Sequence, residues 1–180
     1  MPARIRIPLT HSPTGTADLS WSSKNYTLMV TIALSGLAPG STHLVHIHAG
    51  TCAGMGQIVY TLRPLQADAH GAGLSTTVIG GATSGIPARG WAVNIHNGPT
   101  FATGLAARPI ACGNIASVRS VARGGQSAHA TLATTISPDE NVHGMAQVSV
   151  MGQTIIVALS LSGMAPNTTH LAHIHGSSSH

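Results

Sequence analysis

An internal sequence repeat constrains the fold of this chain more than any other feature. Residues 34–48 read LSGLAPGSTHLVHIH and residues 161–175 read LSGMAPNTTHLAHIH, at an offset of 127. Because such self-similarity marks one structural unit used twice, we expect a first domain over residues 3–116, a linker over 117–127 and a second repeat over 128–180. The second copy stops just after its paired histidines, so we expect this repeat to be incomplete.

Short segments of alternating hydrophobicity recur along the chain. In residues 25–35, apolar side chains such as Leu28 and Val30 share one face of an extended strand. Further segments rich in Val, Ile, Thr and Trp, bounded by Gly or Pro, lie at 73–80, 90–96 and 129–136. No helical period extends over about ten residues. The pattern therefore predicts an all-β fold, either an antiparallel barrel or a sandwich.

The composition excludes two classes of partner. Charged residues are 7% and aromatic residues 3% of the chain, so despite a net charge of +4 it lacks the basic, ring-bearing surface that binds nucleic acid. No apolar run reaches the roughly 18 residues of a membrane-spanning helix. Arg4 and Arg6 interrupt any signal-peptide core, so we expect no signal peptide in this chain.

The chain is rich in histidine. Its 12 histidines, against 4 acidic residues, point to metal chemistry or pH sensing.

Three of the histidines lie on two predicted strands. In the segment HLVHIH, His46 and His48 have the same parity and face away from the apolar residues beside them, and in WAVNIH His96 does the same. If these strands are neighbours, three imidazoles meet on one outer patch, and three nitrogen ligands with an open position suit copper or catalytic zinc. Without a metal, they are polar residues on a solvated face. His43 has the opposite parity, so we expect a hydrogen-bonded core residue there.

The two cysteines allow two interpretations. Cys52 and Cys112 are 60 residues apart, which fits neither a zinc ribbon nor a redox CxxC motif. They are compatible with one disulfide in an exported protein or with two unrelated buried thiols.

Three segments, in order, resemble four motifs of the Cu/Zn superoxide dismutase family. HLVHIHAGTCAG (43–54) is similar to its HxxHxH strand with the disulfide cysteine that follows, GWAVNIHNG (90–98) to its later histidine strand, and PIACGNI (109–115) to its ACGxI motif. The likeness spans residues 3–116. The form AHIHG in the second copy, at 172–176, also resembles the related CHRD repeat domain.

This resemblance implies a fold and a set of site residues. It implies a Greek-key β-barrel of the superoxide dismutase type, followed here by the incomplete second repeat. It implies that His46, His48 and His96 hold copper on the outer face of the barrel. It also implies a disulfide between Cys52 and Cys112 that pins the metal loop to the barrel.

The chain departs from the family at two places. The stretch AGMGQ after Cys52 contains no His or Asp where the family has its zinc ligands and its bridging histidine, so we expect copper without zinc. The family's active-site arginine lies three residues before the second cysteine, where this chain has Pro109. Arg108, one residue further away, is our candidate for the catalytic cation that attracts an anion.

Three functions remain open at this point. The first is a copper-dependent superoxide dismutase, an oxidoreductase with superoxide as its small-molecule substrate. The second is a non-catalytic copper-binding or adhesive module of an extracytoplasmic, CHRD-like repeat protein. The third is a structural barrel with vestigial histidines. The cysteine pair and the resemblance predict a secreted, periplasmic or cell-surface location.

The second copy repeats the paired histidines as His173 and His175, but no counterpart of His96 or Cys52 follows them. We therefore expect at most a weak second metal site there. An incomplete repeat also leaves an unpaired sheet edge. We expect residues 128–180 to form a partial sheet that leans on the first domain or joins another chain in a homo-oligomer.

Overall fold

The computed structural model describes residues 3–9, 12–135, 143–162, 164, 172 and 174. The regular secondary structure of these residues is almost entirely β, apart from a short helix, α1 (Gly104–Ala107), and a 3-10 turn at Ala122–Gly124. The prediction of an all-β fold is confirmed. No helix in the described part of the chain is long and apolar enough to cross a membrane. The chain divides into two compact units, one formed by Pro13–Thr135 and the other by Met1–Ser12 with Ile136–His180.

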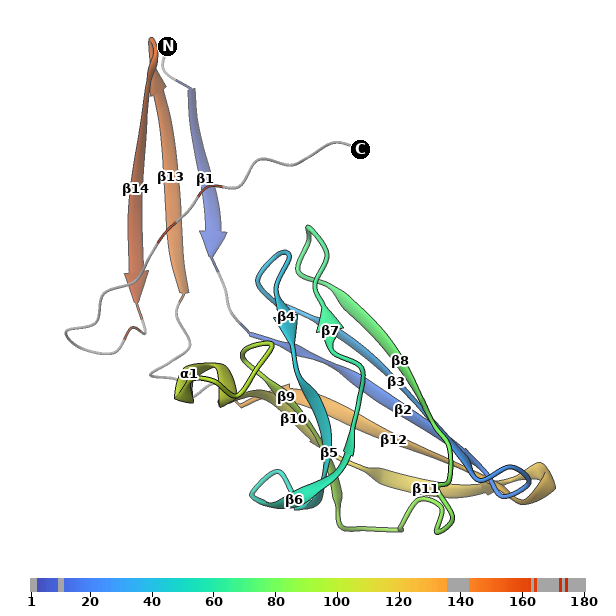
Figure 1. Ribbon diagram of the computed structural model, residues 1–180. Helices are drawn as coiled ribbons and strands as arrows, with labels where there is room; N and C mark the ends of the chain where they lie inside the picture. The colour runs from blue at the N-terminus through green and yellow to red at the C-terminus, as the bar shows by residue number, and fades with distance from the viewer. Residues whose placement is uncertain are drawn as a thin grey trace. The chain divides into compact units, whose positions relative to one another are not determined.

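The larger unit is built on one antiparallel sheet that curls into a half-barrel (Figure 1). In spatial order its strands are β6 (Gly54–Thr61), β5 (Val45–Thr51), β9 (Trp91–His96), β10 (Pro109–Asn114), β12 (Gly125–Thr134), β2 (Thr14–Ser22), β3 (Thr27–Ser35) and β8 (Gly73–Ile79). β11 (Ala116–Val121) also pairs with β12, and β4 (Thr42–His43) pairs with β7 (Leu65–Gln66).

The hydrophobic core fills the inside of the curl. Leu28, Val30 and Ile32 of β3 are at most 1% exposed, as their alternation predicts. The opposite half contributes Val45, Ile47, Val93, Ile95 and Ala111, which are fully buried. Each large apolar side chain buried in this way stabilises the fold by about 1.5–3 kcal/mol. The core therefore holds β5, β9 and β10 in place, and their outer face is left to carry the histidines.

The two ends of the strand order are linked by side chains. Just after β6, the backbone N–H of Arg63 donates to Oγ1 of Thr77 in β8 over 2.8 Å. The hydroxyl of Ser75, also in β8, donates to the carbonyl oxygen of Arg63 over 3.2 Å. The sheet therefore curls far enough for its first and last strands to approach each other.

The smaller unit contains a three-stranded antiparallel sheet of order β1-β13-β14, formed by β1 (Ala3–Leu9), β13 (His143–Met151) and β14 (Thr154–Ser162). GMAQVSV in β13 repeats GTADLSW in β2, with Gly144 matching Gly15. In the sheet of the smaller unit, Leu9 of β1 lies opposite Gly144 of β13. In the sheet of the larger unit, Leu132 of β12 lies opposite Gly15 of β2 in the same way. β1 therefore occupies beside β13 the position that β12 occupies beside β2.

The structural units and the sequence repeat divide the chain at different places. β12 begins at the expected junction between the repeats and lies between β10 and β2 of the larger unit. The boundaries near residues 116 and 128, which describe the sequence duplication, remain a prediction. His173 and His175 lie outside the described residues.

Candidate metal centre

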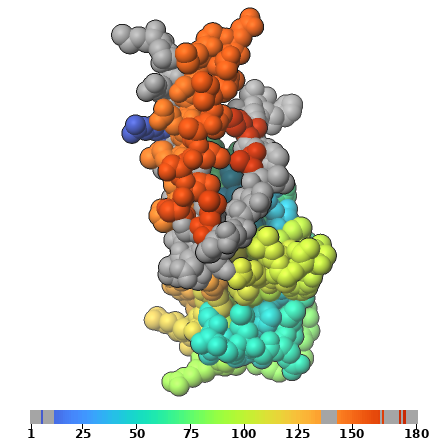
Figure 2. Space-filling view, turned by 90° about the vertical axis from the view of Figure 1, so that its left-hand side faces the viewer, coloured from blue at the N-terminus to red at the C-terminus, as the bar shows by residue number. Residues whose placement is uncertain are grey.

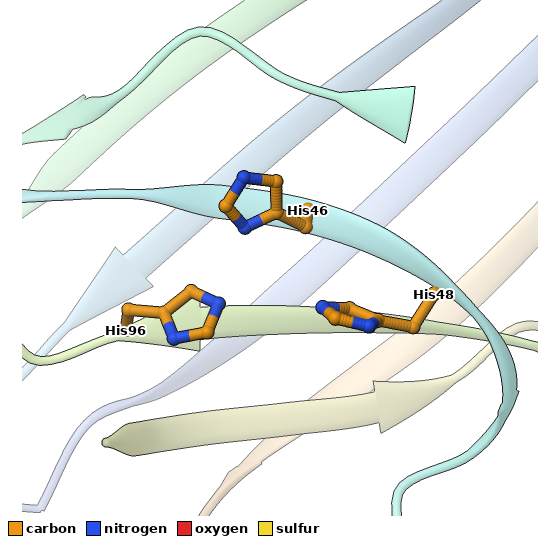
Figure 3. Close-up of side chains that lie close together, drawn as sticks. All are labelled: His46, His48 and His96. Carbon is orange, nitrogen blue, oxygen red and sulfur yellow. The ribbon is translucent and has the colours of Figure 1, made fainter. Parts of the chain in front are cut away.

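The two histidine-bearing strands are neighbours. β5 pairs with β9 in antiparallel register, with His46 opposite Asn94 and His48 opposite Ala92. This pairing brings together the imidazoles of His46, His48 and His96, and one ring nitrogen from each lies within 4.8 Å of the others. Figure 3 shows these rings projecting from β5 and β9 toward a common space. The structure thus assembles the three side chains that the strand parity predicts.

Main-chain carbonyls orient two of the rings. Nδ1 of His48 donates to the carbonyl oxygen of Gly56 over 3.0 Å, and Nδ1 of His96 donates to that of Ala107 over 2.7 Å. Because a carbonyl oxygen only accepts, Nδ1 carries the proton in both rings. In the neutral imidazole, Nε2 then holds a lone pair that can bind a metal ion.

Two ring nitrogens at the centre of the cluster lack a partner. Nδ1 of His46 and Nε2 of His48 are buried and make no hydrogen bond within the described structure. Leaving a buried polar atom unpaired costs about 1–3 kcal/mol. A metal ion bound by these two atoms and by Nε2 of His96 would remove that cost. The donor set of three imidazole nitrogens therefore fits a metal ion such as copper or zinc.

Burial favours the neutral form of His46 and His96. Burial lowers the pKa of His46 to about 4, helped by the neighbouring His96 and His48. Burial also lowers the pKa of His96, although its hydrogen bond to Ala107 acts in the opposite direction. Since only a neutral imidazole binds metal, the lowered pKa values leave His46 and His96 able to bind a metal ion near neutral pH.

The site is more enclosed than a solvated outer patch. His46 is 3% and His96 6% exposed, whereas His48 is half-buried. The ring of Phe101 stacks on His46 with centroids 5.4 Å apart and contacts His96 edge-on at 4.9 Å. Figure 2 shows the yellow-green segment around α1 lying against the cyan residues of β5 and β6. The segment that follows β9 therefore covers the histidines.

Sequence reasoning missed the role of Phe101. It lies in a loop, where strand parity has no meaning, so its contact with the rings could not be predicted. The signal available was that the chain's single phenylalanine lies five residues after His96.

Sequence reasoning also gave no role to Asn94. The Asn94 side chain is 1% exposed, and its Nδ2 lies 3.1 Å from Nε2 of His96. Because Asn94 and His96 are two residues apart in one strand, the sequence places both side chains on the same face. The signal that could have indicated a role is that Asn94 is the only polar residue in the strand before His96, since residues 91–93 and 95 are all apolar.

His43 is a hydrogen-bonded core residue, as predicted. It is 2% exposed, its Nδ1 donates to the carbonyl oxygen of His96 over 2.8 Å, and its Nε2 lies 2.6 Å from the hydroxyl of Ser41. Burial lowers the pKa of His43, against the effect of its hydrogen bonds to the main chain. Its neutral ring therefore holds the end of β9 rather than a metal.

Cys52 and Cys112 form a disulfide, which confirms the pairing that the resemblance implies. The bond joins the turn between β5 and β6 to β10, and the backbone N–H of Cys52 also donates to Oδ1 of Asn114 over 2.8 Å. Gly50, just before this turn, has φ +98, and a Cβ there would overlap the carbonyl of Gly54. The turn is therefore tightly folded, and it fixes the hairpin that supplies His48 and Gly56.

Arg108 follows α1 and precedes Pro109, which lies opposite His96 in the pairing of β10 with β9. Its carbonyl oxygen accepts from the backbone N–H of Asn97 over 2.7 Å, and the residue is exposed. The main chain thus places Arg108 beside the strand end that carries His96.

Fold and site together define a class of protein: an all-β domain whose curled sheet carries a histidine cluster able to hold a metal ion. Residues 4–104 match the family model of the CHRD domain. The chain therefore belongs to the CHRD domain family, the family that the form AHIHG resembles. The matched range includes His46, His48 and His96 and ends before Arg108 and Cys112. No curated protein matches the chain.

Proposed function

We propose that the larger unit binds one copper ion through Nδ1 of His46, Nε2 of His48 and Nε2 of His96. The observation that carries this proposal is the pair of buried, unpartnered nitrogens on His46 and His48, which converge with His96 within 4.8 Å. Among first-row divalent metals, sites with nitrogen donors bind copper most tightly. The tight turn after Cys52 supplies no further His or Asp, so copper without zinc is the expected occupancy.

Metal titration tests the binding. Purified protein exposed to equal copper and zinc should retain one copper per chain, measured by elemental analysis and by the copper(II) electron paramagnetic resonance spectrum. His96→Gln should lose the bound copper. His70→Gln, which alters an exposed turn histidine, should retain it and serves as the control. Stoichiometric zinc without copper, or full copper retention in His96→Gln, would contradict the proposal.

A second candidate function is disproportionation of superoxide. When bound, copper supplies the one-electron transfers in both directions that this reaction needs. The observation that favours the reaction is the half-buried His48 at the site together with the exposed Arg108 beside the strand end of His96. A cation in that position draws a small anion toward the site and raises its rate of encounter.

An activity assay separates the enzyme from a non-catalytic module. Copper-loaded wild type should remove superoxide faster than its metal-free form, and Arg108→Gln should lower that rate several-fold at low salt. Arg119→Gln, an exposed arginine on β11, is the matched control and should not change the rate. Bound copper with no superoxide turnover would instead establish a non-catalytic copper-binding CHRD module.

The proposed location is extracytoplasmic. Membership in the CHRD family and the bond between Cys52 and Cys112 support this, because cytosolic reductants keep such cysteine pairs open. Expression in an oxidising compartment should yield copper-binding protein without free thiols. Equal yields of disulfide-bonded protein from a reducing cytosol would count against the proposal.

The incomplete second repeat is a candidate surface for self-association. Ile155, Val157 and Leu159 of β14 are 64%, 41% and 47% exposed, whereas their counterparts in β3 are buried in the core. A second copy of the chain could cover this apolar surface. Sedimentation equilibrium should show a dimer that the double variant Ile155→Thr/Val157→Thr dissociates. A monomer at all concentrations would exclude the association.

A further inference from the structure

A buried amide lies at the centre of the histidine cluster. Asn94 is 1% exposed and lies opposite His46 in the pairing of β9 with β5. Its Nδ2 is 3.1 Å from Nε2 of His96, and its Oδ1 is buried without a hydrogen-bond partner in the described structure. Within the described structure, the protein therefore supplies a hydrogen-bond partner for the nitrogen of this amide but none for its oxygen.

The one contact of this amide uses the lone pair that a metal would take. Nδ1 of His96 donates to Ala107, so Nε2 of His96 is an acceptor and receives the N–H of Asn94. A metal ion on Nε2 occupies the same lone pair. Both polar atoms of the amide would then be buried and unpaired unless the amide turns toward the metal.

A half-turn of the amide gives the oxygen the metal ion as a partner and leaves only the nitrogen unpaired. The rotation exchanges the two terminal atoms and puts the oxygen of Asn94 about 3.1 Å from Nε2 of His96, where the nitrogen now lies. Two ligand atoms at about 2.0–2.2 Å from one metal ion lie about 3 Å apart when they subtend a right angle. The rotation costs no hydrogen bond in the metal-bound state, because the only one it breaks is already lost.

We propose that Oδ1 of Asn94 is the fourth ligand of the metal ion, which completes a set of three imidazole nitrogens and one amide oxygen. This proposal rests on the proposed copper site. An oxygen donor is harder than an imidazole nitrogen or a thioether. Asn94 therefore favours copper(II) over copper(I) and sets the preference of the site for the oxidised ion.

The test uses the full chain in three forms: wild type, Asn94→Leu and Asn94→Asp. Leucine keeps the size of the side chain and removes both polar atoms, whereas aspartate keeps an oxygen donor and adds a charge. Each form is titrated with copper(II) and with copper(I) against a competing chelator, and its copper(II) spectrum is recorded by electron paramagnetic resonance. Asn25→Leu, in the exposed turn between β2 and β3, is the control.

Asn94→Leu should lower the copper(II) affinity by about tenfold or more, change the copper hyperfine splitting and leave the copper(I) affinity within about threefold. Asn94→Asp should bind copper(II) more tightly than wild type, because a carboxylate oxygen in the ligand position adds a negative charge beside the metal ion. Circular dichroism of the metal-free variants shows whether they fold. If Asn94→Leu does not fold, Asn94→Asp tests the assignment instead. A charged ligand at this position must change both the copper(II) affinity and the copper hyperfine splitting, and a variant that changes neither would remove Asn94 from the site.

Three results would overturn the assignment, and they are distinguishable. A wild-type spectrum and affinity in Asn94→Leu would remove Asn94 from the site and leave the three-histidine site intact. A weaker affinity with an unchanged spectrum would mean that the amide acts through a hydrogen bond and not as a ligand. Failure of wild type itself to bind copper would overturn the proposed function and this ligand together.

Discussion

His43 donates a hydrogen bond from Nδ1 to the main-chain carbonyl oxygen of His96, over 2.8 Å. The bond joins β4 to the last residue of β9, and it is buried. It therefore ties the backbone of a candidate metal ligand to a histidine that does not itself face the site.

Replacing His43 should weaken both the fold and the site. His43→Phe keeps a ring of similar size but leaves the carbonyl of His96 without this donor, so the free energy of unfolding should fall by about 1–3 kcal/mol. Urea unfolding measures this change. Copper affinity should fall by about tenfold, because the ligand loses its support. His70→Phe, in an exposed turn, should change neither quantity, and an unaltered His43→Phe would contradict the supporting role.

Phe101 should control the solvation of His46. Phe101→Ala removes the ring that stacks on the imidazole, so water reaches His46 and its pKa should rise from about 4 toward its ordinary value of 6.5. A pH titration of the histidine ring protons by NMR measures the shift. Leu105→Ala, an exposed residue of α1, is the control from the same segment. A pKa of His46 that stays at about 4 in Phe101→Ala would show that other residues bury the ring.

The stability of the metal-free protein should depend on pH. The pKa of His46 is about 4 in the folded protein and about 6.5 in the unfolded chain, so between these values the unfolded state binds more protons. Stability should thus be full above about pH 6.5 and fall as the pH drops toward 4, by up to about 3 kcal/mol from this residue. Urea unfolding at several pH values tests this, and His46→Gln should show a shallower fall. Equal slopes in the two proteins would assign the loss to other groups.

The disulfide should contribute strongly to stability. Cys52 and Cys112 close a loop with a sequence separation of 60. In the chain-entropy model, this loop is worth about 4 kcal/mol. Cys52→Ala/Cys112→Ala should therefore unfold at a lower urea concentration. It should also bind copper more weakly, because the hairpin carrying His48 is no longer tied to β10. Titration of denatured, unreduced wild type should find no free thiol, and two free thiols would exclude the bond.

The equivalence of β1 and β12 predicts that one strand position can be filled in two ways. β12 lies between β10 and β2, and β1 takes the same register beside β13, the repeat of β2. The family match begins at residue 4, within β1, and ends before β12. A chain ending at residue 121 should therefore place β1 beside β2.

Truncation tests this equivalence and the predicted domain boundary together. Residues 13–135, which keep β12, and residues 1–121, which keep β1, should both fold and form the disulfide. Residues 13–121 lack both strands and should not fold, because the centre of the sheet is open. Circular dichroism and thermal unfolding report the result. If 1–121 is unfolded while 13–135 is folded, β12 is irreplaceable and the first repeat is not an independent domain.

The sequence by itself determined the all-β fold, the core face of β3 and the shared face of His46, His48 and His96. These follow from alternation, since successive side chains of a strand point to opposite sides wherever the strand lies. The buried, hydrogen-bonded state of His43 was readable in the same way. The family likeness added the pairing of Cys52 with Cys112, which spacing alone left open.

Only the tertiary structure decided what surrounds the three histidines. The pairing of β5 with β9 puts His46 beside Asn94, and the loop after β9 brings Phe101 onto the imidazoles. The tertiary structure also decided which strand lies beside β2, which is β12 and not β1. Local alternation specifies the two faces of a strand but neither its neighbours nor the path of a loop. Those depend on contacts between residues far apart in the sequence, whose free energies are set by the packing of the whole sheet.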